Sequence, residues 1–218
     1  DLLKEVSGTE RSLPEELHQS CLHILCLVLD ATKPTEAKQS NDAVSHAINS
    51  PRGRTLESFI HFALALRRDE VATQSGLGET WSAVEPVLEA ELATSESGHN
   101  ADFAAIAGMY CTNLHYLNSE WTEANFDRIF STTSDAAWKC AAQGFAYQRY
   151  LYDWLFKSLV NSGHLRKMVY SEDLPDQVGE KAVQFLGLAY LEDMESLDER
   201  GLLSELITDL RIKDLSQL

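Results

Sequence analysis

Two arginines flank a glycine at Arg52-Gly53-Arg54, directly before a long apolar segment, and such a group could bind phosphate. A P-loop would need a Gly-rich loop after a strand, followed by Gly-Lys-Ser or Gly-Lys-Thr, and that context is missing here. The arginines could still hold a single anion at a helix N-terminus. In a chain so rich in acids, we expect them instead to pair with carboxylates on an adjacent helix.

A second group, His18, Cys21, His23 and Cys26, consists of residue types that bind metals. The pairs His18–Cys21 and His23–Cys26 would each share a helix face and could each give two ligands. A closed zinc site needs four ligands, and no further pair with suitable spacing appears elsewhere in the sequence. We predict a core helix with small sulfur side chains and no metal site.

The thiols of Cys111 and Cys140 could act as nucleophiles only beside an activating base. The sequence does not show whether His115 or His164 lies near either of them. Paired carboxylates are abundant, but 34 acidic residues produce many accidental pairs. We therefore predict a non-catalytic protein without a cofactor, and a small all-α enzyme remains the least favoured alternative.

The charge of the chain limits its partners. A net charge of −16 argues against general affinity for nucleic acid or an anionic membrane, because both require a basic surface. Between Asp69 and Asp127 there are eleven Asp or Glu residues and no Lys or Arg. This acidic block is either a solvated face or a surface for a basic partner, for which Glu85, Glu89 and Glu91 are the candidate contacts.

The four cysteines form no CxxC motif, which indicates reduced thiols and a cytoplasmic protein. The apolar run "ILCLVL" is far too short to cross a bilayer. The chain has no signal peptide and does not begin with Met. We expect a fragment of a larger protein.

Helix signals are dense along the chain, and strand signals are almost absent. A first helix is predicted from the N-cap Ser12 onward, with Pro14 in its first turn, and the polar segment "KPTEAKQSN" follows it. Spacings of three and four predict one buried face for this helix, made of Leu17, Cys21, Ile24, Leu25 and Val28.

Ser50 and Pro51 fit an N-cap and first residue of the next long helix, and apolar residues on two of its sides indicate neighbours on both. "NDAVSHAINS" predicts a short helix before it. Further helices are predicted at about 80–93, 101–117, 120–130, 135–160 (open to a break near Tyr147), 163–170, 176–193 and 199–211.

These elements predict an all-α fold of about ten antiparallel helices, stacked as an irregular α-solenoid. Residues 1–40 would form an N-terminal helix and linker. Residues 41–218 would form one continuous helical-repeat region, although no exact repeat period is visible.

The aromatic stretch "AAWKCAAQGFAYQRYLYDWLF" is the most distinctive segment. Its small residues Ala137, Ala141 and Gly144 would let another helix approach closely, while Trp138 fills the core beside it. The tyrosines that follow cannot all be buried. We therefore predict a contact surface at Arg149, Tyr150 and Tyr152.

The order of "INSPRGRTLESFIHFAL", "WSAVEPVLEAEL", "LHYLNSEWTEANFDRIF", "AWKCAAQGFAYQRYLYDWLFKSL" and "FLGLAYLEDMESLDERGLLSELI" resembles a known family region. It is similar to the C-terminal helical region of large bacterial anti-phage defence proteins. In these, a sirtuin-type NADase or a STAND-type ATPase precedes the helices. The resemblance covers residues 41 to 208, and the Pro-Arg-Gly-Arg turn and the residues around Trp121 and Trp138 are its most specific parts.

The resemblance implies a helical sensor or scaffold that binds a phage-encoded protein, or another domain of the same chain, and so controls an effector located elsewhere. It also implies a structural role for Ser50, Pro51, Arg52 and Arg54. A module for homo-oligomerisation is the main alternative.

Overall fold

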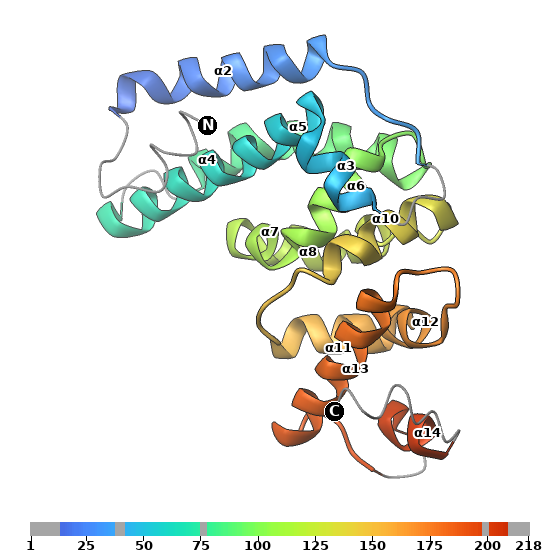
Figure 1. The fold of residues 1–218 in the computed structure, drawn as a ribbon. Helices are drawn as coiled ribbons and strands as arrows, with labels where there is room; N and C mark the ends of the chain where they lie inside the picture. The colour runs from blue at the N-terminus through green and yellow to red at the C-terminus, as the bar shows by residue number, and fades with distance from the viewer. Residues whose placement is uncertain (1–13, 38–41, 75–77, 198–200, 209–218) are drawn as a thin grey trace. The chain divides into compact units, whose positions relative to one another are not determined.

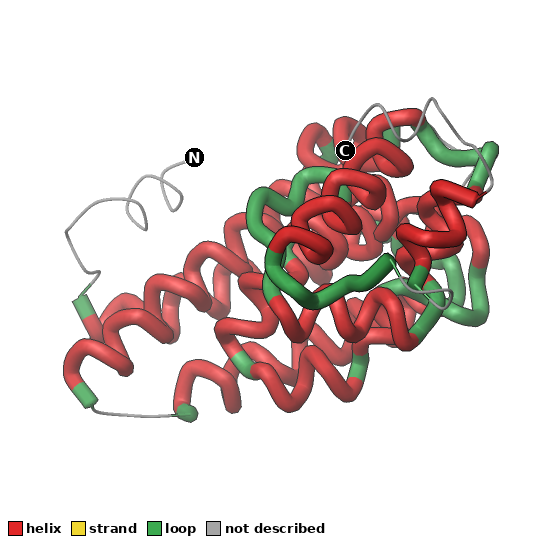
Figure 2. Tube along the Cα trace, turned by 90° about the horizontal axis from the view of Figure 1, so that it is seen from below, coloured by secondary structure: helices red, strands yellow, loops and turns green. Residues whose placement is uncertain are grey.

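The computed structural model describes residues 14–37, 42–74, 78–197 and 201–208. Within these residues the protein has thirteen helices. Figure 2 shows helices joined by loops, with no strand in the described residues. The predicted all-α class is therefore confirmed, whereas the solenoid-like stacking stays a prediction. The chain separates into two compact units, Asp1–Gly144 and Phe145–Leu218. This division falls inside the region 41–218 that the sequence suggested to be continuous.

The first unit is built around α4 (Pro51–Thr73), which α2 (Glu15–Ala31) follows along its length (Figure 1). Helices packed on several sides of α4 account for its two buried apolar stripes. The other helices of this unit are α3 (Ala43–Asn49), α5 (Glu79–Glu96), α6 (Ala101–Met109), α7 (Cys111–Leu117), α8 (Ser119–Ala124), α9 (Phe126–Ile129) and α10 (Asp135–Phe145).

The second unit contains α11 (Asp153–Asn161), α12 (His164–Tyr170), α13 (Asp176–Leu191) and α14 (Leu202–Thr208). Each of these helices packs against the next one along the chain. The buried side chains of α13 recur at helical spacing and form the centre of this unit: Val178, Ala182, Val183, Phe185, Leu186 and Ala189.

The predicted segments 101–117 and 120–130 are each two helices, so the described helices outnumber the prediction. The first break lies at Tyr110, whose hydroxyl donates to Glu57 Oε1 at 2.7 Å and lies 3.0 Å from His61 Nε2. The second lies at Asn125, whose side-chain amide donates to the Trp121 carbonyl. A single residue thus separates the two helices of each segment, although the apolar pattern of both segments is continuous. The break suggested near Tyr147 occurs as the loop 146–152.

Of the predicted buried face of the first helix only Leu25 is buried, and Cys21 is half-buried. In α2 the buried residues are Leu25 and Leu29, whereas Leu17, Ile24 and Val28 are exposed. The run "ILCLVL" makes the second half of the helix apolar on all sides, so spacing alone could not select the face that meets α4. The predicted N-cap Ser12 lies outside the described residues.

Ser50 and Pro51 begin α4 as predicted. The Ser50 hydroxyl accepts a hydrogen bond from the Gly53 amide at 2.8 Å and donates to Asp102 Oδ1 at 2.7 Å. Asp102 also accepts a bond from the Thr35 amide at 3.3 Å. A single cap thus connects α4 to α6 and to the chain that follows α2.

Arg52 is buried and joins three helices. Its Nη1 donates to the carbonyls of Leu29 at 2.7 Å and Thr32 at 2.5 Å, which end α2. Its other nitrogens form a bidentate pair with Glu91 on α5. Arg54 is exposed, with no ion pair among the described residues. The prediction of an ion pair with an adjacent helix holds for Arg52.

Close helix contacts explain two small residues in the first unit. A Cβ on Gly53 would lie 2.1 Å from the Ala47 carbonyl oxygen, so α3 meets α4 at van der Waals distance. A Cβ on Gly144 would lie 2.1 Å from the Ala105 oxygen, which places α6 against the predicted small-residue groove of α10. Trp138 is fully buried beside it, as predicted.

A candidate protein-binding pocket

Much of the acidic block serves internal contacts. Glu91 is only 5% exposed and binds Arg52 and, through Oε2, the Asn100 amide at 2.7 Å. Its suggested role as a surface contact is therefore corrected, because a partner cannot reach it. Glu70 accepts a hydrogen bond from the Thr80 amide at 2.6 Å, which caps α5. It also forms an ion pair with Arg67 at 3.1 Å. Burial opposes ionisation of Glu70, but these bonds outweigh it and lower the carboxyl pKa.

Glu89 and Glu96 together hold Arg128, with N–O distances of 3.0 and 2.6 Å. Hydrogen bonding to Glu96 contributes most to the raised pKa of Arg128. Glu89 also accepts a hydrogen bond from the Trp121 indole N–H at 2.5 Å, which links α8 to α5. Among the described residues, the carboxylates of the block without an ion pair include Glu85, together with Asp69, Glu79 and Glu120. The block is thus largely a scaffold of internal bonds and only in part a free surface.

The two candidate nucleophiles lie in the core. Burial raises the pKa of the Cys111 thiol to about 12. Burial, with a smaller contribution from Asp102, raises the pKa of Cys140 to about 11. Of the two candidate bases, His115 lies against Glu123 at 3.0 Å and His164 is buried. An activated thiolate requires a lowered pKa, so these environments suit structural thiols.

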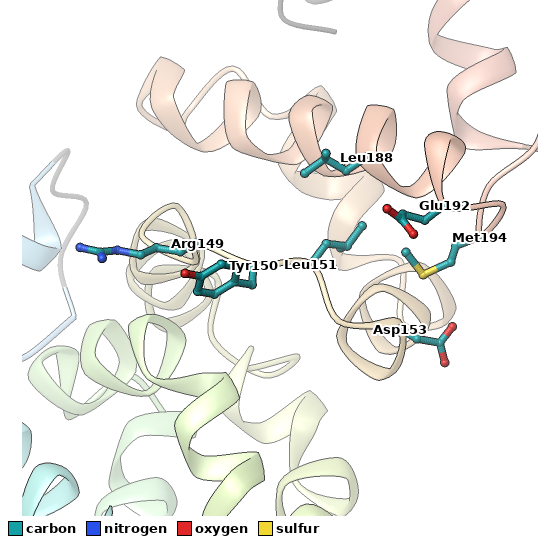
Figure 3. A pocket seen from close by; sticks show the side chains of 7 residues that line it. All are labelled: Arg149, Tyr150, Leu151, Asp153, Leu188, Glu192 and Met194. Atoms are coloured by element: carbon teal, nitrogen blue, oxygen red, sulfur yellow. The ribbon is translucent and has the colours of Figure 1, made fainter.

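A pocket of about 610 Å³ lies within the second unit, between the loop 146–152 and the C-terminal end of α13 (Figure 3). It is a depression open to solvent and not an enclosed cavity. Its floor is apolar and its ends are charged. The lining residues are Arg149, Tyr150, Leu151, Asp153, Leu188, Glu192 and Met194.

Buried residues hold the loop in place. Phe145 packs edge-on against Phe185 of α13, with 5.2 Å between the ring centroids. The Gln148 amide donates to the Phe145 carbonyl at 2.8 Å, and the Gln148 side chain is buried. The loop ends where the Tyr152 carbonyl accepts the Phe156 amide and α11 begins. Anchors at both ends leave the residues between them facing solvent.

The other wall is set by the way α13 ends. The Asp193 amide donates to the Tyr190 carbonyl at 3.3 Å, and the Met194 amide donates to the Ala189 carbonyl at 2.8 Å. This pair of bonds is a Schellman motif, in which the position of Asp193 is left-handed and usually glycine. Asp193 has φ +57°. The turn brings Met194 back to the pocket and leaves acidic residues at the helix end.

Large apolar side chains are exposed in the pocket lining and in the chain segment next to it. Tyr150 is 67% exposed, Leu188 is 44% exposed and Leu191 is 74% exposed. Tyr190 and Leu197 are also exposed nearby along the chain. Contiguous exposed apolar residues rimmed by polar ones typically mark interaction sites.

Two of the sequence-predicted contacts, Arg149 and Tyr150, line the pocket. Tyr152 is exposed at the start of α11 and is not among the lining residues. The pocket does not include Glu85, Glu89 or Glu91. Sequence reasoning missed Leu188, Glu192 and Met194. The signal available for them was "AYLED", where large apolar and acidic residues end a helix that has no basic residue in its last turn.

Comparison of the chain with protein-family models, curated proteins and solved structures finds no match in any of the three. In the described part of the chain, no helix combines the length and apolar character needed to span a bilayer. The same residues contain no cluster of three or more His, Cys, Asp or Glu side chains that could hold a metal ion.

Proposed function

We propose that this chain is a non-catalytic recognition module that binds another protein through the pocket of the second unit. The observation that carries the proposal is a pocket in which the exposed side chains of Tyr150 and Leu188 lie between charged lining residues, among them Arg149 and Glu192. Tyr, Arg and Met are enriched in protein interfaces, where aromatic and Arg side chains dominate the binding energy.

The resemblance to anti-phage defence proteins supports a more specific role. In that role the chain is the sensing region of a larger cytoplasmic protein. The partner is then a phage-encoded protein or another domain of the same chain, and binding controls an effector such as an NADase. The first test is to read the open reading frame upstream of Asp1. An effector domain there would support the defence role, and a start codon directly before Asp1 would contradict it.

The binding role is tested by substituting exposed residues of the pocket, with substitutions of exposed residues elsewhere as controls. Tyr150→Ala with Leu188→Ser should weaken binding of a phage or intramolecular partner about tenfold or more, because truncated interface anchors cost more than 1 kcal/mol. The control Tyr116→Ala with Ile24→Ser removes an exposed tyrosine and an exposed aliphatic side chain from the first unit. Calorimetry measures the affinity of each double variant for the partner, and circular dichroism verifies that each is folded. Equal affinity of both double variants would contradict the proposal.

The same exposed residues make self-association the second candidate. Tyr150 and Leu191 would be the contacts between copies. The net charge of −16 opposes it, because two copies repel each other. A partner of different charge is therefore favoured.

A further inference from the structure

We propose that the pocket takes a short segment of a partner protein in which a large apolar side chain lies between a basic residue and an acidic one. This rests on the proposed function and specifies the chemistry of its partner. Figure 3 shows the polarity of the site, with Arg149 at one end and Glu192 at the other.

The negative end favours a Lys or Arg side chain. Glu192 and Asp193 end the sixteen-residue helix α13, which has no basic residue in its last turn. The C-terminus of a helix carries partial negative charge, so these carboxylates add to an already negative field. Neither forms an ion pair with a described residue, whereas Asp153 is paired with Lys157 at 2.8 Å. A cation from a partner would relieve this repulsion.

The positive end favours a carboxylate. Arg149 is exposed and, within the described residues, forms no ion pair. Its side chain extends outward from the loop (Figure 3), so the guanidinium is available for two parallel hydrogen bonds. A Glu or Asp of the partner would meet it in that geometry.

The middle of the pocket accepts an apolar side chain. Tyr150, Leu151, Leu188 and Met194 supply this surface. Met is flexible and polarisable, so Met194 adapts to aromatic or aliphatic groups. The apolar surface separates the two charged ends of the pocket. A peptide segment with a basic, a large apolar and an acidic side chain in order therefore fits better than a free ion.

The test is selection of peptides from a random display library on the intact chain, with Leu188→Ser, Glu192→Lys and Arg149→Glu selected in parallel. The wild-type chain should enrich peptides with a Lys or Arg at a fixed spacing from a large apolar residue. On Glu192→Lys the enriched residue at that position should become acidic. On Arg149→Glu the opposite end of the motif should become basic.

Affinities are then measured by fluorescence anisotropy with the most enriched peptide. Glu192→Gln should weaken binding about threefold, as for an exposed ion pair. Glu192→Lys should weaken it about tenfold, because the like charges repel. The control Glu120→Lys changes an exposed acid on α8 of the first unit and should have no effect on binding.

The outcomes separate the two proposals. If no peptide is enriched in a manner that depends on Leu188, the binding function itself fails. If enrichment depends on Leu188 but the peptides lack a basic residue and ignore Glu192→Lys, only the polarity inference is overturned. Unfolding curves of each variant identify any that lose binding by failing to fold.

Discussion

Arg52 and Glu91 place opposite charges in the interior of the first unit, where neither is solvated by bulk water. Removing one partner of such a pair leaves the other charge buried, and this usually costs more than the pair contributes. Arg52 also donates to two carbonyls at the end of α2, so its loss would remove hydrogen bonds from three groups at once.

We therefore expect Arg52→Ala to lower the free energy of unfolding by about 3–5 kcal/mol. The control Arg54→Ala removes an exposed arginine two residues away and should change stability by about 0.5 kcal/mol or less. Urea unfolding followed by circular dichroism measures both. Similar free energies of unfolding for the two variants would contradict the structural role of the buried Arg52.

The thiols give a second prediction at the scale of residues. The pKa values of about 12 for Cys111 and about 11 for Cys140 leave almost no thiolate in neutral solution. At pH 8, about one in a thousand or fewer of these thiols is ionised. A thiol reagent should modify the half-exposed Cys21 and Cys26 in the native protein and all four cysteines in denaturant. Rapid native labelling of Cys111 or Cys140 would contradict their burial.

At the scale of elements, the contact of α6 with α10 depends on the absence of a side chain. The nearest atoms to a Cβ on Gly144 are backbone atoms of Ala105 and Met109, which cannot rotate away. Overpacking of this kind forces the helices apart.

Gly144→Ala should therefore destabilise the first unit by about 3 kcal/mol. In the control Gly179→Ala, the nearest atom to the new Cβ is 3.7 Å away, which is an ordinary contact. Since Ala is the better helix former, this control should be neutral or stabilising by about 0.5 kcal/mol. The midpoint of thermal unfolding should fall for Gly144→Ala and should stay unchanged or rise for Gly179→Ala.

The end of α13 gives another prediction for an element. Asp193 has a left-handed conformation and adds negative charge at a helix C-terminus. Asp193→Gly removes both the unfavourable backbone conformation and the unfavourable charge. It should stabilise the second unit by about 1 kcal/mol. Asp193→Ala removes only the charge and should stabilise it less. Equal thermal midpoints for Gly and Ala variants would show that the left-handed conformation carries no cost.

At the scale of the whole molecule, the chain has a net charge of −16. Self-repulsion keeps equal copies apart, so sedimentation should give a monomer at all concentrations accessible at low salt. A mass that rises with concentration and returns to the monomer in Tyr150→Ala would instead support the self-association candidate.

Local signals accounted for the helices and their caps. Ser50 and Pro51 begin α4 because capping depends on residues within one turn. The pairing of an arginine with an acid on a neighbouring helix was also predictable, because a buried charge needs an opposite one. The choice of Glu91 for Arg52 was not, since the two are 39 residues apart and eleven acids of the block were equally available.

The sequence by itself determined the helical class, the start of α4, the small-residue groove of α10 and the exposure of the tyrosines after it. These follow from propensity, spacing and side-chain size, which act over a few residues. Only the tertiary structure decided which face of α2 is buried, that Glu91 is internal, and that Arg149 and Glu192 lie at opposite ends of one pocket. Those outcomes depend on the packing of distant segments, and the spacing of residues along one helix does not encode it.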